Sequence, residues 1–171
     1  MAPAPRLMTV DDYLRTPETV LPSELVYGVL RVAESPLAGH QSLVAELFVA
    51  LRAHVREHRL GTVWIAPLDV ILGYGHIVSD RVHGAPDLAI EVLSPGTRKT
   101  DETRKRRLYE RFGVDEYWIV DPEGELIKVY RRSGAGYGLA TELTCEHQHV
   151  LETPLFPGLR LALADVFAQP Q

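Results

Sequence analysis

The chain has 171 residues, 46% of them hydrophobic and 24% charged, with a formal net charge of −5 at pH 7. This composition is ordinary for a globular protein, and the length predicts one domain over residues 1–171. No apolar run approaches the ~18 residues that a membrane span needs, and the first residues lack the apolar core of a signal peptide. The single cysteine, Cys145, fits the reducing cytoplasm in which we expect the protein.

Hydrophobic periodicity and turn residues divide the chain into helices and strands. The predicted elements are, in chain order, a short helix that begins at Thr9 and ends at Pro17, a hairpin around Gly28, a helix over 40–60, strands over 62–65, 68–72 and 86–95, a helix over 100–112, strands over 116–121 and 126–131, and a closing helix over 161–167. Helices alternate with strands early, and strands dominate later. The pattern predicts an α/β fold with a mixed β-sheet core flanked by helices.

The strand PDLAIEVLSP, residues 86–95, carries two acids within an otherwise apolar sequence. Apolar residues at both alternating sets of positions predict a central strand that is covered on both faces. A buried carboxylate costs several kcal/mol unless it is paired or holds a metal ion. Asp87 and Glu91 are therefore candidate site residues.

The helix over 100–112 places an acid and a base on its apolar stripe. With Asp101 at the origin of a helical wheel, ~100° per residue puts Lys105 near 40°, Leu108 near −20° and Phe112 near 20°. An inward lysine needs a carboxylate partner or a role in a site. One interpretation is an ion pair between Asp101 and Lys105, and the other is that Lys105 reaches Glu91 on the preceding strand.

The segment from residue 98 to residue 111 is strongly basic within an acidic chain. It contains seven bases and three acids, so its charge is +4 and that of the rest of the chain is −9. Such a patch is typical of a site for a phosphate-bearing ligand and equally of a solvated helix face. Both interpretations stay open from the charge alone.

Two carboxylates and a lysine at a strand edge suit metal-dependent hydrolysis of a phosphodiester. Carboxylate oxygens are ligands for Mg²⁺, which polarises the phosphate and lowers the pKa of an attacking water. A lysine orients that water or stabilises the charge that develops in the transition state.

Nearly the whole chain resembles the bacterial putative restriction endonuclease family of the PD-(D/E)XK nuclease superfamily. The resemblance is carried by ELVYGVL (24–30), SPLAGHQ (35–41), APLDVIL (66–72), GAPDLAIEVLSPGTRKTDETRKRRLYERFGVDEYWIVDPEGE (84–125) and LFPGLRLALADVF (155–167). It implies a restriction endonuclease-like fold and a divalent metal, Mg²⁺ or Mn²⁺. On this pattern Glu91 is a metal ligand, Lys105 is the catalytic lysine, and Glu24 and His40 are further polar residues that face the site.

The first metal ligand has two candidates. Many family members carry an additional Pro-Asp strand before the one that contains Glu91, whereas this chain has GYGHIVSDRVHGAPD at residues 73–87. Asp87 shares a face with Glu91, but four strand residues separate their Cα atoms by about 13 Å. If the strand over 68–72 pairs with the one over 86–95, Asp69 lies nearly opposite Glu91.

Two functional hypotheses follow. The first is a metal-dependent endonuclease that hydrolyses DNA phosphodiester bonds, acting as a homodimer because cutting both strands commonly needs two sites. The dimer rests on analogy with the fold. The second is a catalytically inactive nuclease-fold module that binds nucleic acid or a partner protein, which the missing Pro-Asp strand and the net charge favour.

Overall fold

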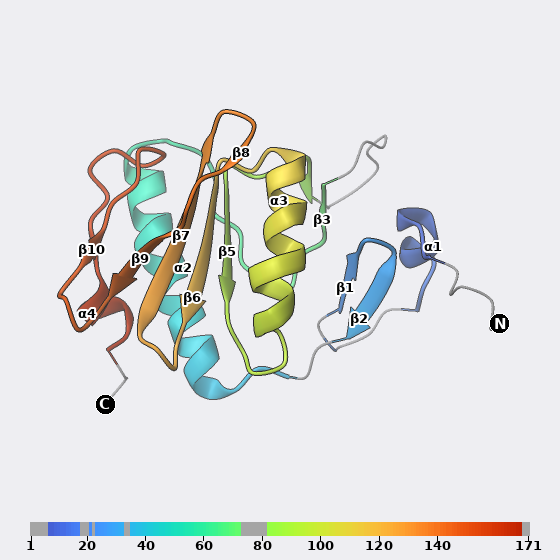
Figure 1. The fold of residues 1–171 in the computed structure, drawn as a ribbon, viewed down its shortest axis with the longest axis horizontal. Helices are drawn as coiled ribbons and strands as arrows, with labels where there is room; N and C mark the ends of the chain where they lie inside the picture. Colours follow the sequence, from blue (N-terminus) through green and yellow to red (C-terminus); the bar gives the residue numbers. More distant parts are fainter. Residues whose placement is uncertain (1–6, 18–20, 22, 33–34, 73–81, 169–171) are drawn as a thin grey trace. The chain divides into compact units, whose positions relative to one another are not determined.

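The computed structural model describes residues 7–17, 21, 23–32, 35–72 and 82–168 (Figure 1). The chain forms two compact units, Met1–Pro36 and Leu37–Gln171, and each is described by itself. The single domain expected for residues 1–171 stays a prediction. Among the helices of the described ranges, none combines the length and hydropathy that crossing a bilayer requires.

The first unit contains a capped helix and a hairpin, as predicted. Helix α1 (Val10–Leu14) begins after Thr9, which forms a capping box with Asp12. Strands β1 (Ser23–Val26) and β2 (Val29–Val32) are antiparallel and joined by Tyr27 and Gly28, both with positive φ. A Cβ atom at Gly28 would come within 2.7 Å of the Cβ of Leu7, so the turn needs glycine for space as well as for conformation.

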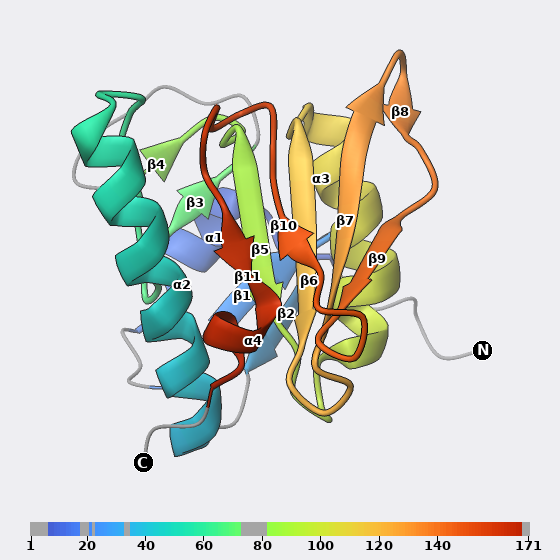
Figure 2. The same ribbon diagram turned by 90° about the vertical axis from the view of Figure 1, so that its left-hand side faces the viewer.

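The core of the second unit is a mixed five-stranded sheet (Figure 2). Its strands are β5 (Leu88–Val92), β6 (Glu116–Asp121), β7 (Leu126–Ser133), β8 (Gly136–Tyr137) and β9 (Thr141–Thr144). β5 is parallel to β6, whereas β7 is antiparallel to β6, β8 and β9. The fold is therefore the predicted α/β class with a mixed sheet.

The expectation that the strand around Glu91 is central is wrong for the described part of the sheet. There β5 pairs with β6 alone, and every residue of β5 is only partly buried. All six residues of β6 are buried instead. The apolar sequence of β5 reflects helices on both sides of the sheet, and periodicity alone does not distinguish that cover from a central position.

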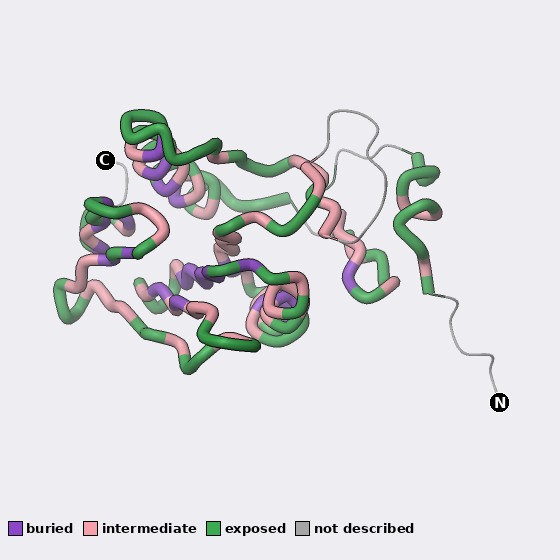
Figure 3. Tube along the Cα trace, turned by 90° about the horizontal axis from the view of Figure 1, so that it is seen from above, coloured by how far each residue is buried: buried purple, intermediate pink, exposed green. Residues whose placement is uncertain are grey.

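Two helical layers cover opposite faces of this sheet. Helix α2 (Ala38–Glu57) buries a stripe at four-residue spacing, as predicted, and Leu43, Leu47 and Leu51 pack with Trp118 and other core residues. The π-helix η1 (Thr100–Lys105) continues as α3 (Arg106–Phe112), which ends at Gly113 with φ 88°. Tyr117 and Ile119 of β6 pack on that second side. Figure 3 shows the buried residues along β6 and on one side of α2.

The remaining elements are short. β3 (Val70–Ile71) runs parallel to β4 (Val82–His83), and β10 (Val150–Leu151) pairs with β11 (Leu161–Ala162), which leads into α4 (Leu163–Val166). The predicted strand over 62–65 is wrong: these residues have no strand structure, and Trp64 is 65% exposed. Most of the glycine-rich segment after Leu72, residues 73–81, lies outside the described residues.

Candidate active site

Glu91 lies on the face of β5 that is turned towards η1 and α3. Its neighbours at alternate positions, Ala89 and Leu93, belong to the cluster on that face, while Ile90 and Val92 pack with the α2 cluster on the other. The Glu91 side chain is 23% exposed, so its carboxylate is half-buried and still open to solvent. Strand alternation thus sets which side of the sheet carries the acid.

Lys105 joins Glu91 to Asp101. Its ammonium nitrogen lies 3.1 Å from Oε2 of Glu91 and 3.0 Å from Oδ1 of Asp101. The lysine side chain is 9% exposed and that of Asp101 1%, so this is a buried cluster with one half-buried acid. The two interpretations of the inward lysine are both right, because one ammonium group contacts both carboxylates.

The local backbone helps to produce this contact. The segment is a π-helix in which the N–H of Arg106 donates to the carbonyl of Asp101, five residues earlier. A π-turn contains an additional residue compared with an α-turn, and such segments are frequent at functional sites. The regular wheel used above predicted the inward direction of Asp101 and Lys105 but not this wider turn.

Two tyrosines complete the cluster. The hydroxyl of Tyr109 donates to Oε1 of Glu91 at 2.9 Å, so each carboxylate oxygen of Glu91 has a partner. The hydroxyl of Tyr117 donates to the backbone carbonyl of Asp101 at 3.1 Å. Burial raises the pKa of Tyr117 far above its usual range, which keeps this donor protonated. Tyr109 was not among the predicted site residues, although it lies four residues after Lys105 on the inward side of the helix.

The charge of Asp101 depends on its surroundings. Burial, and after it the nearby charge of Glu91, raise the pKa of this carboxyl to about 6 against the opposing effect of the Lys105 ammonium. Asp101 is thus ionised above about pH 6, where it holds the lysine by charge, and it is neutral in mild acid. Its place beside Lys105 makes it a positioning residue for the lysine.

We expect Asp101→Asn to remove a pH-dependent part of the unfolding free energy. Because the folded chain holds the Asp101 proton up to about pH 6 and the unfolded chain only to about 3.8, the wild type loses stability as pH rises through that window. The loss is at most about 3 kcal/mol, since one pH unit corresponds to ~1.4 kcal/mol. Urea unfolding of both proteins at pH 4, 5, 6 and 7 measures it, and parallel stability curves would contradict the assignment.

His40 and Asp87 do not contact the carboxylate of Glu91. Nε2 of His40, on the first turn of α2, lies 3.0 Å from the carbonyl of Val92, so the protonated nitrogen donates to the residue beside Glu91. Asp87 is exposed immediately before β5, and its carbonyl accepts the N–H of Glu116. His40 therefore holds the end of the strand, and Asp87 lies four residues from Glu91 along it.

Asp69 and Glu24 have other neighbours than the sequence suggested. Asp69 directly precedes β3, which pairs with β4, so the pairing of residues 68–72 with the Glu91 strand is wrong; the carbonyl of Asp69 accepts the N–H of Val82. Glu24 lies in β1, opposite Arg31, within the first unit. The roles given to Asp69 and Glu24 stay predictions.

The donor chemistry at Glu91 fits a hard divalent cation in part. Mg²⁺ takes oxygen ligands and is held by as few as one or two carboxylates, with water and substrate phosphate completing its shell. Glu91 supplies such a carboxylate at a half-buried position. Among the described residues, no three side chains of His, Cys, Asp or Glu gather into a metal-binding group.

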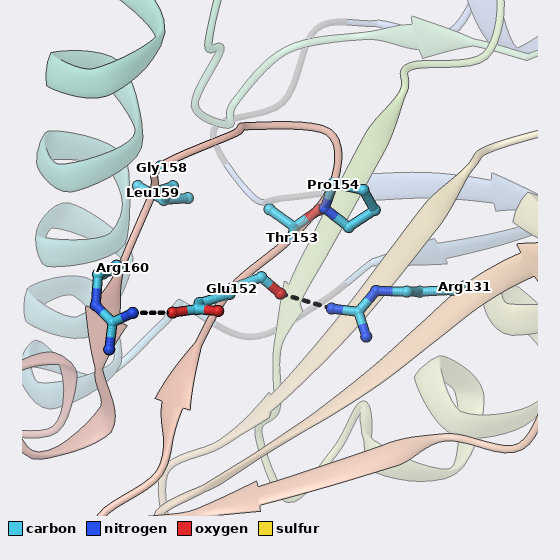
Figure 4. A pocket seen from close by; sticks show the side chains of 7 residues that line it. All are labelled: Arg131, Glu152, Thr153, Pro154, Gly158, Leu159 and Arg160. Atoms are coloured by element: carbon cyan, nitrogen blue, oxygen red, sulfur yellow. Dashed lines mark hydrogen bonds and ion pairs between the residues drawn. The ribbon is translucent and has the colours of Figure 1, made fainter.

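A cavity of about 530 Å³ near the C-terminal strands is a separate feature (Figure 4). Arg131 and Arg160 line it, and both are engaged by Glu152: Arg131 donates to its carbonyl at 2.7 Å and Arg160 pairs with its carboxylate. Neither Glu91 nor Lys105 lines this cavity. The cluster around Glu91 and Lys105 is therefore separate from this hollow.

The structure is thus a mixed sheet with helices on both faces and a carboxylate–lysine cluster on the face that η1 and α3 cover. Residues 10–164 match the family model Uma2, described as putative restriction endonuclease, and the chain belongs to this family. It is also similar to the crystal structure of a putative nuclease of the DUF820 family from Anabaena variabilis, with 21% identity and a TM-score of 0.77 over 94% of this chain and 97% of that one. That similarity shows the fold. No curated protein matches the chain.

Proposed function

We propose that this protein is a Mg²⁺- or Mn²⁺-dependent endonuclease that hydrolyses phosphodiester bonds in DNA. The observation that carries the proposal is the Lys105 ammonium held 3.1 Å from Glu91 and 3.0 Å from Asp101. A buried lysine that is fixed between a buried acid and a half-buried acid is an arrangement that serves phosphate chemistry. Membership of a family described as putative restriction endonuclease supports the nucleic-acid substrate.

Each residue of the cluster has a distinct role in this proposal. Glu91 would hold the metal ion, with Asp87 or Asp69 as the proposed second ligand; the bound ion would polarise the phosphate and lower the pKa of an attacking water. Lys105 orients the water or stabilises charge on the phosphate oxygens. Tyr109 fixes the Glu91 carboxylate by its hydrogen bond, and Asp101 fixes the ammonium group.

Two further parts of the proposal concern assembly and position. We propose a homodimer, because a double-strand cut commonly uses two sites related by symmetry. His40 supports the site through the β5 backbone, since its ring donates to the carbonyl next to Glu91 in the chain. Glu24 is proposed as a further polar residue of the site, as the family resemblance implies.

Glu91→Gln is expected to lower the rate of plasmid nicking in Mn²⁺ by about 100-fold or more, because the neutral amide is a poor metal ligand and no longer pairs with Lys105. The matched control is Glu57→Gln, an exposed acid at the end of α2, which should nick like the wild type. Equal nicking by all three proteins would reject Glu91 as a site residue.

A nuclease-fold module that binds nucleic acid or a partner protein without cutting it is the second candidate. It is favoured by the engagement of both Glu91 oxygens, one by Lys105 and one by Tyr109, which would satisfy the carboxylate without a metal. Calorimetry separates the two candidates: a Mn²⁺ binding heat that Glu91→Gln removes supports the nuclease, and its absence from the wild type supports the module.

A further inference from the structure

The helix that carries Lys105 is divided by charge. Between residues 98 and 112 the exposed positions are four bases and a threonine: Lys99, Thr103, Arg104, Arg107 and Arg111. The acids of the same segment are buried or only partly exposed, and each has a partner. Asp101 is buried, Glu102 pairs with Lys128 at 3.0 Å, and Glu110 accepts the N–H of Tyr137. The fully exposed charged residues of η1, α3 and the N-cap before them are therefore all bases, here called the basic face: Lys99, Arg104, Arg107 and Arg111.

The bases of this segment fall into two groups. Arg98 forms a bidentate pair with Asp121, at 2.6 and 2.9 Å, and also contacts Glu123, while Arg106 lies over the ring of Tyr130. The four bases of the basic face have no ion pair or side-chain hydrogen bond with any described residue; Arg111 lies over the ring of Phe112.

An unpaired cationic surface is unexpected on a chain whose net charge is −5. Four like charges along one helix repel each other and lower the stability of the fold. Such a surface is therefore typical of a site that binds an anion. Arg107 and Arg111 are four residues apart on α3, about 6 Å along its axis, and Arg104 precedes Arg107 by three residues. A linear array of this kind matches a ligand with regularly repeated negative charges.

The place of the array indicates which polyanion it binds. Arg104 directly precedes Lys105 in the chain, so the exposed array and the buried cluster belong to one helical segment on one face of the sheet. Building on the function proposed above, we infer that Lys99, Arg104, Arg107 and Arg111 bind the phosphodiester backbone of duplex DNA and hold it along η1 and α3, the helical segment that carries Lys105. The contacts are to phosphates, so they provide affinity without sequence preference.

The chain itself contains a matched control. Arg52 and Arg56 of α2, and Arg59 just after it, are likewise exposed and have no ion pair with a described residue; Arg52 lies over the ring of Phe48, as Arg111 does over Phe112. They follow similar spacing, but α2 covers the opposite face of the sheet from Glu91. Replacing either set of three arginines by glutamine changes the net charge equally, so a difference between the two variants reports position and not total charge.

The test measures binding of a fluorescein-labelled 20-base-pair duplex by anisotropy, in EDTA, over a series of NaCl concentrations. R104Q/R107Q/R111Q should raise the Kd roughly tenfold or more at low salt, and should make the slope of log K against log salt shallower by about 3, since each phosphate contact contributes ~0.9. R52Q/R56Q/R59Q should leave the slope of the wild type unchanged. Circular dichroism of both variants checks that they are folded.

The outcomes separate this inference from the proposed catalysis, because binding in EDTA needs no metal and no cleavage. Equal weakening by the two triple variants would show an effect of net charge and overturn the inference, as would an unchanged slope in R104Q/R107Q/R111Q. A wild type that does not bind the duplex would overturn it too. A wild type that binds with the expected slopes but does not nick plasmid in Mn²⁺ would support the basic face and reject the endonuclease.

Discussion

Replacing Lys105 by methionine should abolish Mn²⁺-dependent nicking and lower the free energy of unfolding by about 3 kcal/mol at pH 7. Methionine keeps most of the side-chain volume but removes the ammonium group that faces Glu91 and Asp101 at 3.1 and 3.0 Å. The remaining carboxylates are then a close, largely buried pair of like charges, and breaking a buried ion pair in this way typically costs ~3–5 kcal/mol. Urea unfolding and plasmid nicking measure the two effects separately.

The loss of stability should shrink at pH 5. There Asp101 is protonated even in the wild type, because its pKa of about 6 lies above that pH, and a neutral carboxyl needs no cation. Removing Lys105 raises the pKa of Asp101 further, which reduces the cost again. A loss that is the same at pH 5 and pH 8 would contradict the assignment of the shifted pKa to Asp101.

Two variants separate charge from geometry. Lys128→Met removes a half-buried lysine that pairs with Glu102 at 3.0 Å, and it should cost less than about 1 kcal/mol and leave nicking unchanged.

Lys105→Arg keeps the charge, so it should recover part of the stability, but the planar guanidinium does not replace a point charge in the cluster and nicking should stay low. Full nicking by Lys105→Arg would show that Lys105 acts only through its charge.

Local patterns in the sequence predicted the elements that flank the site. The four-residue spacing of Leu43, Leu47 and Leu51 predicted the buried stripe of α2, and Gly113 predicted the end of α3. The strand over 116–121 was predicted with the bounds that the structure shows. These features depend on residues close to each other in the sequence, and rules on periodicity and capping use only such residues.

The pairing of strands that are distant in the sequence could not be predicted from such local patterns. The partner of β3 is β4, a two-residue strand without a hydrophobic pattern of its own, and no rule on spacing selects it over β5. The position of Glu91 on an edge strand of the described sheet also depends on which strands pair. Asp69 became a candidate, in competition with Asp87, only through the assumed pairing of its strand with the one that contains Glu91.

The cluster itself was predicted in outline. Glu91 and Lys105 were placed together because a strand and the following helix are adjacent, and Asp101 because it shares the inward stripe. Tyr109 was missed because a tyrosine on an inward stripe is usually a core residue; its hydroxyl gains a role only when the acid across from it is known. Glu116 was missed because two of its three partners, Arg131 and Thr153, are distant in sequence.

Glu116→Ala should lower the free energy of unfolding by about 3–5 kcal/mol, an effect as large as that of losing Lys105. The residue is 2% exposed, and its carboxylate accepts hydrogen bonds from Trp118 Nε1 at 2.8 Å, Arg131 Nε at 2.9 Å and Thr153 Oγ1 at 2.7 Å. Without the acid, the indole N–H of Trp118 and the hydroxyl of Thr153 lose their acceptor at buried positions, where unpaired polar groups are costly, and the partly exposed guanidinium of Arg131 loses its ion pair. Urea unfolding at pH 7 measures the change.

The network has a defined control and a defined coupling. Glu142→Ala removes an exposed acid of β9 whose nearest cation, Lys128, is 3.8 Å away, and it should cost less than about 1 kcal/mol. Thr153→Val deletes one donor of the network; combined with Glu116→Ala it should cost less than the sum of the two single changes, by about 0.5–3 kcal/mol. Additive losses would show that the hydroxyl and the carboxylate act independently.

Glu116 also tests whether stability and catalysis are carried by different faces of one sheet. In β6 it alternates with Tyr117 and shares a face with Trp118, which packs in the α2 cluster, whereas Glu91 and Lys105 lie on the α3 side. At a temperature where Glu116→Ala is still folded, its nicking rate in Mn²⁺ should therefore equal that of the wild type. A folded Glu116→Ala protein that binds DNA normally but does not nick it would show that the two faces are coupled through β6, since Tyr117, between Glu116 and Trp118, donates to the carbonyl of Asp101.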